Sequence, residues 1–519
     1  MKNITKYLII VAGIVLGFAC VKEPTMSDTE IEQRSLKAWI EKYHPELLEN
    51  YQEEGGYYVE ILDRGVQDSL PITGKDAWLW VDFTARDLQG NVCETRSWEL
   101  ALQQNTYNNH THYTPVFRFS GKDSHTLLEG SYLAIFNKLK IGDEEFEARY
   151  GTRLRLYLPS TVTSSNTGGT ADGGYEGQYE LDGDKPAIVD MMVYGHITNP
   201  VAYEGNRVDS FANINGGLCT EHKAEPKEDE ESAEKSMRRR ITRADSEEGE
   251  EEIDTRPLEF FDGRWHQPID TLAQLYVNYA YSPARNTFDY NAIGVDTLMY
   301  PSENGYDKGK IYGSTTLADI DRRINEALVE RFGEGITYDE VLEADSLQTK
   351  ATANVWYIGR FLDGYVFDTN IDEVREIVFG DVGEAGEALS FETKEPLEND
   401  YILAWNYSLP TLRLGQWATI LTVSTYAYGI SGQVGAHTST TTGDTSAIDY
   451  ANYYNYMSYM NSMYGYGYGS MYNSGYYGYN PYYYGYNYVP SNTNTTTITT
   501  TATEIPSYSP MIFQVFVEK

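Results

Sequence analysis

The stretch of sequence that decides the fold lies at residues 355–368 and reads VWYIGRFLDGYVFD. Residues 355–361 are mostly aromatic and aliphatic side chains, which favour a strand. Asp363 and Gly364 then supply a turn dipeptide, and residues 365–368 return to aromatic and apolar side chains. Read locally, the segment predicts a strand, a tight turn and a second strand.

Further blocks follow this segment in the chain. They read YILAW, LGQWA, YAYG, IP and MIFQV, at residues 401–405, 414–418, 426–429, 505–506 and 511–515. Together with the first segment they resemble the FKBP-type peptidyl-prolyl isomerase family, whose pattern there is V-x-Y-x-G-x-x-x-D-G-x-x-F-D. The blocks occur in the family order, although Ala404 replaces a usual glycine. The order is what makes the resemblance specific.

The resemblance implies a pocket for a prolyl ring in the C-terminal part of the chain. Trp405 would form its floor, and Asp368 would lie at its rim. The residues expected to act on the substrate are Tyr357, Phe367, Asp368, Trp405, Tyr428 and Phe513, and those expected to bind it are Tyr401 and Ile402. The resemblance implies neither a cofactor nor a metal ion.

An aromatic pocket suits this reaction. Rotation about an X–Pro amide is slow because resonance holds the bond planar, with a barrier of ~18–20 kcal/mol. A dry cavity removes the water that stabilises the planar, more polar amide. Asp368 would supply a fixed charge near the twisting carbonyl, and the Tyr428 hydroxyl would hold a neighbouring carbonyl. The alternative is that these rings are ordinary core side chains, as most aromatic residues in strands are.

The first half of the chain resembles the same family in a degraded form. Phe83, Cys93, Glu94 and Ser131 stand where the family has Tyr, Phe, Asp and Trp. No A-Y-G block follows them. We therefore expect this half to keep the frame of the domain and to lack its pocket, which predicts a binding or spacing domain.

The whole sequence predicts an α+β protein of two FKBP-like domains, each a twisted antiparallel sheet wrapped on a short helix. The degenerate domain is expected at residues 27–215 and the complete one at residues 316–519, with a Tyr-rich insertion at residues 433–503. A disordered acidic linker is predicted at residues 221–256, because this stretch has too few apolar residues to form a core. Residues 257–313 are expected to add strands, and one interpretation places them in the sheet of the first domain.

Two capped helices suggest an internal duplication. A capping box at residues 27–30 begins a predicted amphipathic helix that ends before Pro45. A second amphipathic helix is predicted at residues 316–333. A strand led by glycine is expected after each helix, at residues 56–59 and 335–338, so the two halves are predicted to repeat one order of elements.

Residues 1–20 are typical of a targeting segment. Lys2 and Lys6 precede an apolar run at residues 7–19, which is shorter than the ~20 residues of a transmembrane helix. Cys20 follows directly, so the segment resembles a bacterial lipobox, and we predict that Cys20 is lipidated. This places the chain in a bacterial cell envelope, attached to a membrane through Cys20. The alternative is an ordinary signal peptide with an incidental cysteine.

Composition excludes some functions. The net charge of −37 argues against nucleic acid, because binding to phosphates needs clustered Lys and Arg. Apart from Cys20, only Cys93 and Cys219 remain, which is too few for a disulfide framework. His110 and His112 could offer two metal ligands, but no third ligand has a recognisable spacing, so no metal site is predicted.

Two low-complexity runs lie near the C-terminus. Residues 450–488 contain 17 of the 46 tyrosines, and residues 491–503 are almost all Thr and Asn. Neither run has a period that predicts a packed element. In the FKBP pattern this part of the chain folds over the pocket mouth, so the tyrosines are expected either to capture polypeptides there or to form a tether without a role.

The predicted function is prolyl isomerisation and chaperoning in the bacterial envelope, with proline-containing polypeptides as partners. The alternative is a non-enzymatic surface or assembly lipoprotein that uses the same fold for binding. The full set of pocket residues favours the enzyme. The loss of pocket residues from the first domain and the long Tyr-rich insertion favour the binding protein.

Overall fold

The computed structural model describes residues 27–72, 77–121, 125–163, 186–219, 260–269, 271–285, 288–290, 312–380, 385–433, 435–442 and 495–519. The predictions about Cys20, the linker at residues 221–256 and residues 450–488 lie outside these ranges. Within the described ranges, no helix has both the length and the apolar character needed to cross a membrane.

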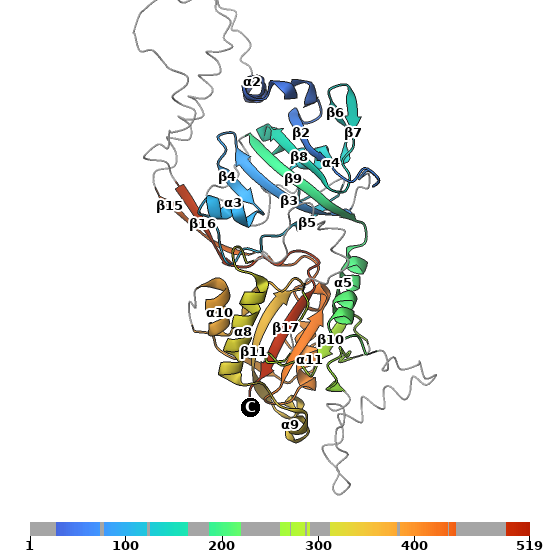
Figure 1. Ribbon diagram of the computed structural model, residues 1–519, viewed down its shortest axis with the longest axis vertical. Helices are drawn as coiled ribbons and strands as arrows, with labels where there is room; N and C mark the ends of the chain where they lie inside the picture. The colour runs from blue at the N-terminus through green and yellow to red at the C-terminus, as the bar shows by residue number, and fades with distance from the viewer. Residues whose placement is uncertain are drawn as a thin grey trace, which may run out of the picture.

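The chain is an α+β protein whose helices and antiparallel sheets form two units along the long axis of the molecule (Figure 1). The first unit contains α2 (Asp28–Tyr43), β1 (Tyr51–Gln52), β2 (Tyr57–Arg64), β3 (Ala77–Asp87), β4 (Val92–Thr95), α3 (Trp98–Gln103), β5 (Val116–Ser120), α4 (Glu129–Phe136), β6 (Leu139–Ile141), β7 (Glu144–Phe146), β8 (Thr152–Leu158) and β9 (Ala187–Ile197). Helix α5 (Pro200–Ile214) leads to the second unit, which contains β10 (Leu275–Asn278), α8 (Leu317–Phe332), α9 (Tyr338–Glu343), β11 (Thr352–Phe361), β12 (Val366–Thr369), α10 (Asp372–Phe379), β13 (Leu389–Glu392), α11 (Leu403–Ser408), β14 (Trp417–Thr422), β15 (Ala436–Thr442), β16 (Thr495–Ala502) and β17 (Met511–Val517).

The main sheets of the two units share one strand order. The first runs β1-β2-β8-β9-β3-β4 with β5 paired to β3, and the second runs β10-β14-β17-β11-β12 with β13 paired to β11. Strands β2, β8, β9, β3, β4 and β5 therefore correspond to β10, β14, β17, β11, β12 and β13. The register agrees as well, since Ala85 lies opposite Glu94 in one sheet and Gly359 lies opposite Asp368 in the other.

The two capped helices are confirmed. Ser27 and Glu30 exchange the hydrogen bonds of a capping box at the start of α2, which ends at Tyr43. The Thr316 side chain accepts a hydrogen bond from a backbone N–H at the start of α8, and Gly333 follows its last residue. The apolar face of α8 is buried as its spacing predicts, at Leu317, Ile320, Ile324 and Leu328.

Helix α8 covers one face of the second sheet. Successive side chains of a strand point to opposite faces, and the register aligns Trp356, Phe516 and Trp417 on one of them. All three rings contact Phe332 of α8, at centroid distances of 5.7, 4.9 and 5.7 Å. Because α8 occupies this face, the opposite face is the one left for a site.

The same face buries a charged side chain. Arg360 is 1% exposed, and it donates hydrogen bonds to Asp321 Oδ1 at 2.6 Å, to the Gly364 carbonyl at 2.9 Å and to Gln514 Oε1 at 2.9 Å. Asp321 belongs to α8, whereas Arg360 belongs to β11. A guanidinium taken out of water is tolerated only with such partners. The ion pair therefore ties the helix to the sheet.

The interpretation that residues 257–313 extend the first sheet is wrong. Strand β10 pairs with β14 of the second sheet, with Leu275 opposite Thr422. In the first sheet the corresponding edge is already filled by β1 and β2. The free edge of β14 can instead bury all four side chains of β10.

The predicted strand at residues 335–338 is also wrong. The Thr337 side chain and Glu340 form a capping box, so the segment enters helix α9. The counterpart of the glycine-led strand β2 is β10, which precedes α8. The strand and the capped helix therefore come in opposite orders in the two units.

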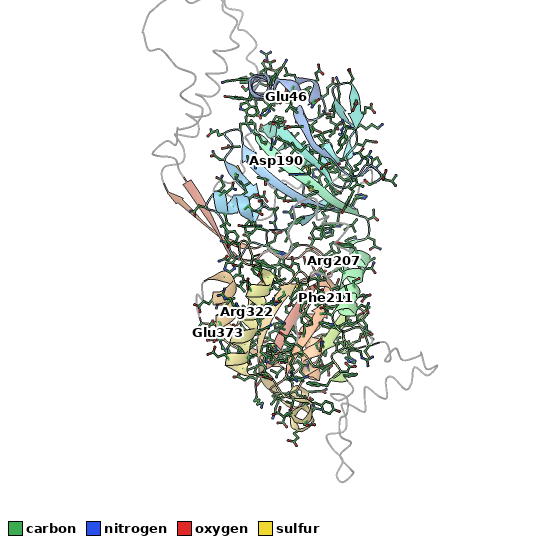
Figure 2. All side chains as sticks on the ribbon, viewed as in Figure 1. Glu46, Asp190, Arg207, Phe211, Arg322 and Glu373 are labelled. Carbon is green, nitrogen blue, oxygen red and sulfur yellow. The ribbon has the colours of Figure 1, made fainter. Side chains whose placement is uncertain are left out.

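Two predicted boundaries also shift. Helix α5 was expected in the first domain, but its apolar side chains join the core of the second unit, at Val208, Phe211 and Ala212. Figure 2 shows Phe211 and Arg207 on this helix beside the second sheet. Residues 495–502, expected to form no packed element, are strand β16, which pairs with β15 in a separate sheet.

Candidate functional site

The aromatic residues predicted to line a pocket come together on the sheet face opposite α8. Tyr357, Phe367 and Phe513 project from β11, β12 and β17, and Trp405 approaches them from α11. The ring centroids of Tyr357 and Phe513 lie 4.9 and 5.4 Å from that of Trp405, at interplanar angles of 65° and 81°. Phe367 lies 6.0 Å from Phe513 and 6.0 Å from Tyr428, at 84° and 85°. Edge-to-face contacts of this kind are the favourable arrangement for aromatic pairs.

Gly359 makes room for one of these rings. A Cβ atom on Gly359 would lie 2.6 Å from Cζ of Phe367, which is closer than real contacts allow. In the first unit, the register places Ala85 at the position of Gly359, and the residue at the position of Phe367 is Cys93. At the first of these positions the first unit therefore has a methyl group where the second has a glycine without a side chain. At the second position it has a small thiol where the second unit has an aromatic ring. The sequence motif contained Gly359, but its spacing did not show this role.

Asp368 lies at the partly exposed rim of the ring cluster. Its Oδ2 atom accepts a hydrogen bond of 2.8 Å from the Tyr357 hydroxyl. Burial raises the pKa of the Asp368 carboxyl, although this hydrogen bond and the positive charge of Arg375 oppose the change. Burial and the nearby Asp368 both raise the pKa of the Tyr357 hydroxyl. At neutral pH the tyrosine therefore keeps its proton, and its hydroxyl donates a hydrogen bond to Asp368.

Two polar atoms in the cluster are available to a ligand. The Trp405 Nε1–H is buried and has no acceptor within the described part of the chain. The Tyr428 ring is half-buried, and among the described residues its hydroxyl has no hydrogen-bond partner. Buried polar groups are nearly always paired, so an unpaired donor on an aromatic floor is suited to the carbonyl group of a bound molecule.

Tyr401 and Ile402 flank the rings at the start of α11. The Tyr401 ring lies 6.5 Å from Trp405, and its hydroxyl donates to the Ser390 carbonyl at 2.6 Å. Ile402 is the residue before the first turn of α11 and is half-buried. Their rings and alkyl groups can line the edge of a site, whereas the Tyr401 hydroxyl is already used. Cys20, the predicted lipidation site, is outside the described residues.

The corresponding face of the first unit has no such ring cluster among its described residues. Cys93, Glu94 and Ser131 are all buried, and aliphatic side chains pack around α4, among them Leu127, Leu128, Leu133 and Leu158. Leu158 approaches so closely that a Cβ on Gly130 would lie 2.4 Å from its Cδ2. This face is filled as an ordinary core.

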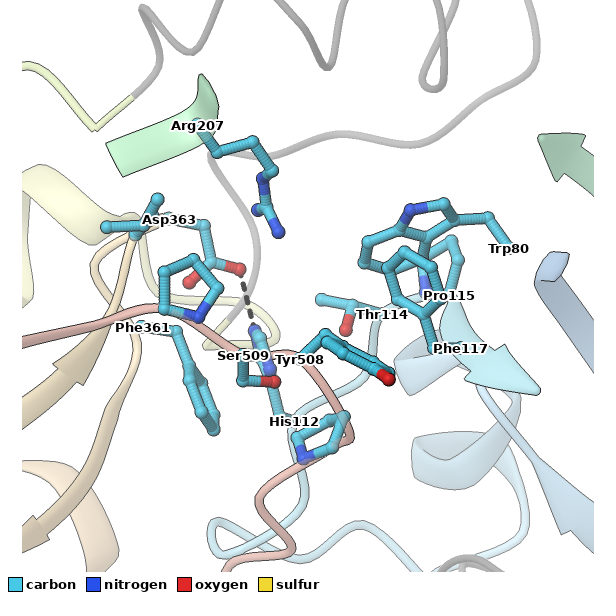
Figure 3. Close-up of a pocket in the computed structure, with 13 residues that line it drawn as sticks. Trp80, His112, Thr114, Pro115, Phe117, Arg207, Phe361, Asp363, Tyr508 and Ser509 are labelled. Atoms are coloured by element: carbon cyan, nitrogen blue, oxygen red, sulfur yellow. Dashed lines mark hydrogen bonds and ion pairs between the residues drawn. The ribbon is translucent and has the colours of Figure 1, made fainter. Parts of the chain in front are cut away.

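A cavity of about 50 Å³ lies elsewhere, at the junction of the two units (Figure 3). Trp80 and Phe117 line it from the first unit, Asp363 and Tyr508 line it from the second, and Arg207 of α5 reaches over it. None of the predicted site residues belongs to its lining. We place the candidate site at the rings, because the residues predicted for the site lie together there and not around the cavity.

His110 and His112, which the sequence suggested as weak metal ligands, instead contact the second unit. His112 Nε2 donates to Asp363 Oδ2 at 2.7 Å, and its ring stacks on Tyr365 at 4.4 Å. The His110 ring stacks on Phe379 at 4.2 Å. Within the described ranges, no group of three or more His, Cys, Asp or Glu side chains could hold a metal ion.

The contact at Asp363 is expected to weaken in acid. Burial would raise the pKa of the Asp363 carboxyl, but His112 and the charge of Arg207 hold it below its usual value. A carboxyl whose pKa is lower in the folded protein than in the unfolded chain, where it is ~3.9, stabilises the folded state at pH values above ~3.9. This contribution is lost as the pH falls through the lower pKa of the folded protein. Small-angle scattering between pH 6 and pH 3 should show the units separating below about pH 4. Asp363→Asn removes the titrating carboxyl and should therefore remove this transition, and the same midpoint in both proteins would contradict the expectation.

Comparison with known proteins identifies no family model and no curated protein that matches this chain. Among solved structures, the three FKBP domains of wheat FKBP73 align at 12% identity with a TM-score of 0.18, over 90% of this chain and 95% of that one. FkpA from Escherichia coli aligns at 12% identity with a TM-score of 0.21, over 38% and 72%. A peptidyl-prolyl cis-trans isomerase from Pseudomonas syringae aligns at 15% identity with a TM-score of 0.20, over 33% and 98%. The first of these neighbours consists of FKBP domains, and the third is a peptidyl-prolyl isomerase.

Proposed function

We propose that the second unit is an FKBP-like domain that catalyses cis–trans isomerisation of X–Pro bonds in polypeptides, and that the first unit is a degenerate relative of it. The observation that carries the proposal is the layer of edge-to-face rings around Trp405, with a buried unpaired donor at Trp405 and the half-buried Tyr428 beside Phe367. The strand order that the two sheets share supports the view that the units are related.

The chemistry needs no covalent step. A prolyl ring lies on Trp405 between Tyr357 and Phe367, where burial removes water from the amide. The Tyr428 hydroxyl donates to a backbone carbonyl of the substrate and fixes one side of the rotating bond. Asp368, held by Tyr357, presents its charge to the twisting carbonyl. Each contribution is electrostatic or steric, and together they stabilise the twisted amide over the planar one.

The test is the exchange rate of an X–Pro tetrapeptide, measured by NMR with the whole chain from residue 27. The protein should accelerate exchange, and Asp368→Asn should reduce kcat/KM about tenfold or more, because a preorganised charge is lost. Glu94→Gln in the first unit is the matched control and should leave the rate unchanged. If the wild-type protein does not accelerate exchange, or if both variants lose the same activity, the proposal is wrong.

The second candidate function is binding without catalysis, in a surface or assembly role. It is favoured by the first unit, where Cys93 and Ser131 replace ring positions and the face is filled. The same NMR experiment separates the two functions. A binding protein would shift the resonances of the prolyl peptide without accelerating its exchange.

We further propose that the protein acts as a folding chaperone in a bacterial cell envelope, anchored to a membrane through lipidated Cys20. This proposal rests on the apolar run at residues 7–19 and the cysteine that follows it. Proline-containing polypeptides of the same compartment would be its partners.

A further inference from the structure

Helix α5 makes a buried polar contact with the loop that carries Tyr428. Glu204 of α5 is 1% exposed, so its carboxylate is out of water. Its Oε2 atom accepts a hydrogen bond of 2.9 Å from the Ser424 hydroxyl, and its Oε1 atom accepts one from the Ser424 backbone N–H. Hydrogen bonds to a charged acceptor are the stronger kind, and breaking one of a buried pair leaves its partner unsatisfied.

Ser424 in turn fixes the two residues on either side of Tyr428. Its carbonyl accepts a hydrogen bond of 2.9 Å from Ala427 N and one of 2.8 Å from Gly429 N. Tyr428 thus lies between two amides that share one acceptor. The N–H and hydroxyl groups of that same serine are held by Glu204. The position of the Tyr428 ring beside Phe367 therefore depends on a carboxylate outside the second sheet.

The helix that carries Glu204 begins in the first unit. Strand β9 of the first sheet ends at Ile197, and α5 starts at Pro200. Asn199 caps the helix by accepting a hydrogen bond from Ala202 N. The helix then packs along β14, the strand that leads into Ser424. The chain therefore runs from the first sheet through α5 to the residue that holds the Tyr428 loop.

We propose that Glu204, on the helix that joins the two units, is a positioning residue for Tyr428. This inference rests on the proposed function of Tyr428. A second unit without the Glu204 carboxylate would keep its rings and lose the fixed position of the tyrosine.

The anchoring is tested by hydrogen exchange in the whole chain. Glu204→Leu should speed exchange of the amides of Ala427 and Gly429 about tenfold or more, because their acceptor is no longer held. Val208→Ala removes a buried apolar group from the same helix and should leave these amides protected. Glu204→Gln keeps one acceptor oxygen and can donate to the serine hydroxyl, so it should retain most of the protection. Unchanged exchange in Glu204→Leu, or equal loosening in Val208→Ala, would overturn the inference.

The positioning role is tested by a double-mutant cycle on prolyl-peptide isomerisation. Glu204→Leu should lower kcat/KM about tenfold when Tyr428 is present and have little effect in the Tyr428→Phe background, since the two act through one hydroxyl. Equal losses in both backgrounds would mean that Glu204 acts on the fold alone and would overturn the role. If the wild-type protein has no isomerase activity, the proposed function fails, and the exchange measurement still decides whether Glu204 holds the loop.

Discussion

Replacement of Asp321 by alanine is expected to lower the free energy of unfolding of the second unit by about 3–5 kcal/mol, the usual cost of leaving a buried charge without its partner. Arg360 would keep its bonds to the Gly364 carbonyl and Gln514 but would lose its counter-ion. The loss should appear in urea unfolding followed by fluorescence of Trp356 and Trp417, which pack on the same face beneath α8.

A surface pair on the same helix provides the control. Arg322 and Glu326 lie 3.0 Å apart with side chains 58% and 64% exposed. Glu326→Ala should cost about 0–1 kcal/mol, because exposed pairs contribute little in water. The double variant Asp321→Leu with Arg360→Met should recover most of the stability, since a well-packed apolar pair can replace a buried ion pair. If Asp321→Ala costs no more than Glu326→Ala, Arg360 does not depend on its carboxylate.

Gly359→Ala is expected to lower kcat/KM for prolyl peptides on the order of 100-fold, because displacement of a positioned group by about 1 Å can cost that much. The new Cβ would lie 2.6 Å from Cζ of Phe367 and would force the ring toward the site. Overpacking of this kind also costs about 1–3 kcal/mol of stability.

The cycle with Phe367→Ala shows whether the effect passes through the ring. In a protein that already lacks the ring, Gly359→Ala should have little further effect on the rate. Ala85→Gly, at the matching position of the first unit, should leave the rate unchanged. If Gly359→Ala lowers the rate equally with and without Phe367, the ring is not the cause.

The sequence by itself determined the elements whose signals are local. The capping box at residues 27–30, the apolar face of α8 and the turn at Asp363 and Gly364 each depend on residues within a few positions of one another, and each is present in the structure. The order of the blocks after residue 355 also indicated which rings would gather around Trp405. Alternation along β11 and β17 then places Tyr357 and Phe513 on one face.

Tertiary structure alone decided how the units are joined and held. Strand β10 could have extended either sheet, and it joined the one whose edge strand, β14, was free. Glu204 and Ser424 are separated by 220 positions, and Asp321 and Arg360 by 39. The sequence around a buried polar residue does not indicate which residue will be its partner, because the pairing depends on which surfaces meet after the sheets have formed. The local sequence pattern therefore specified the strands and helices. The contacts between them were specified by which sheet edges remained unpaired and by which groups could pair with a buried charge.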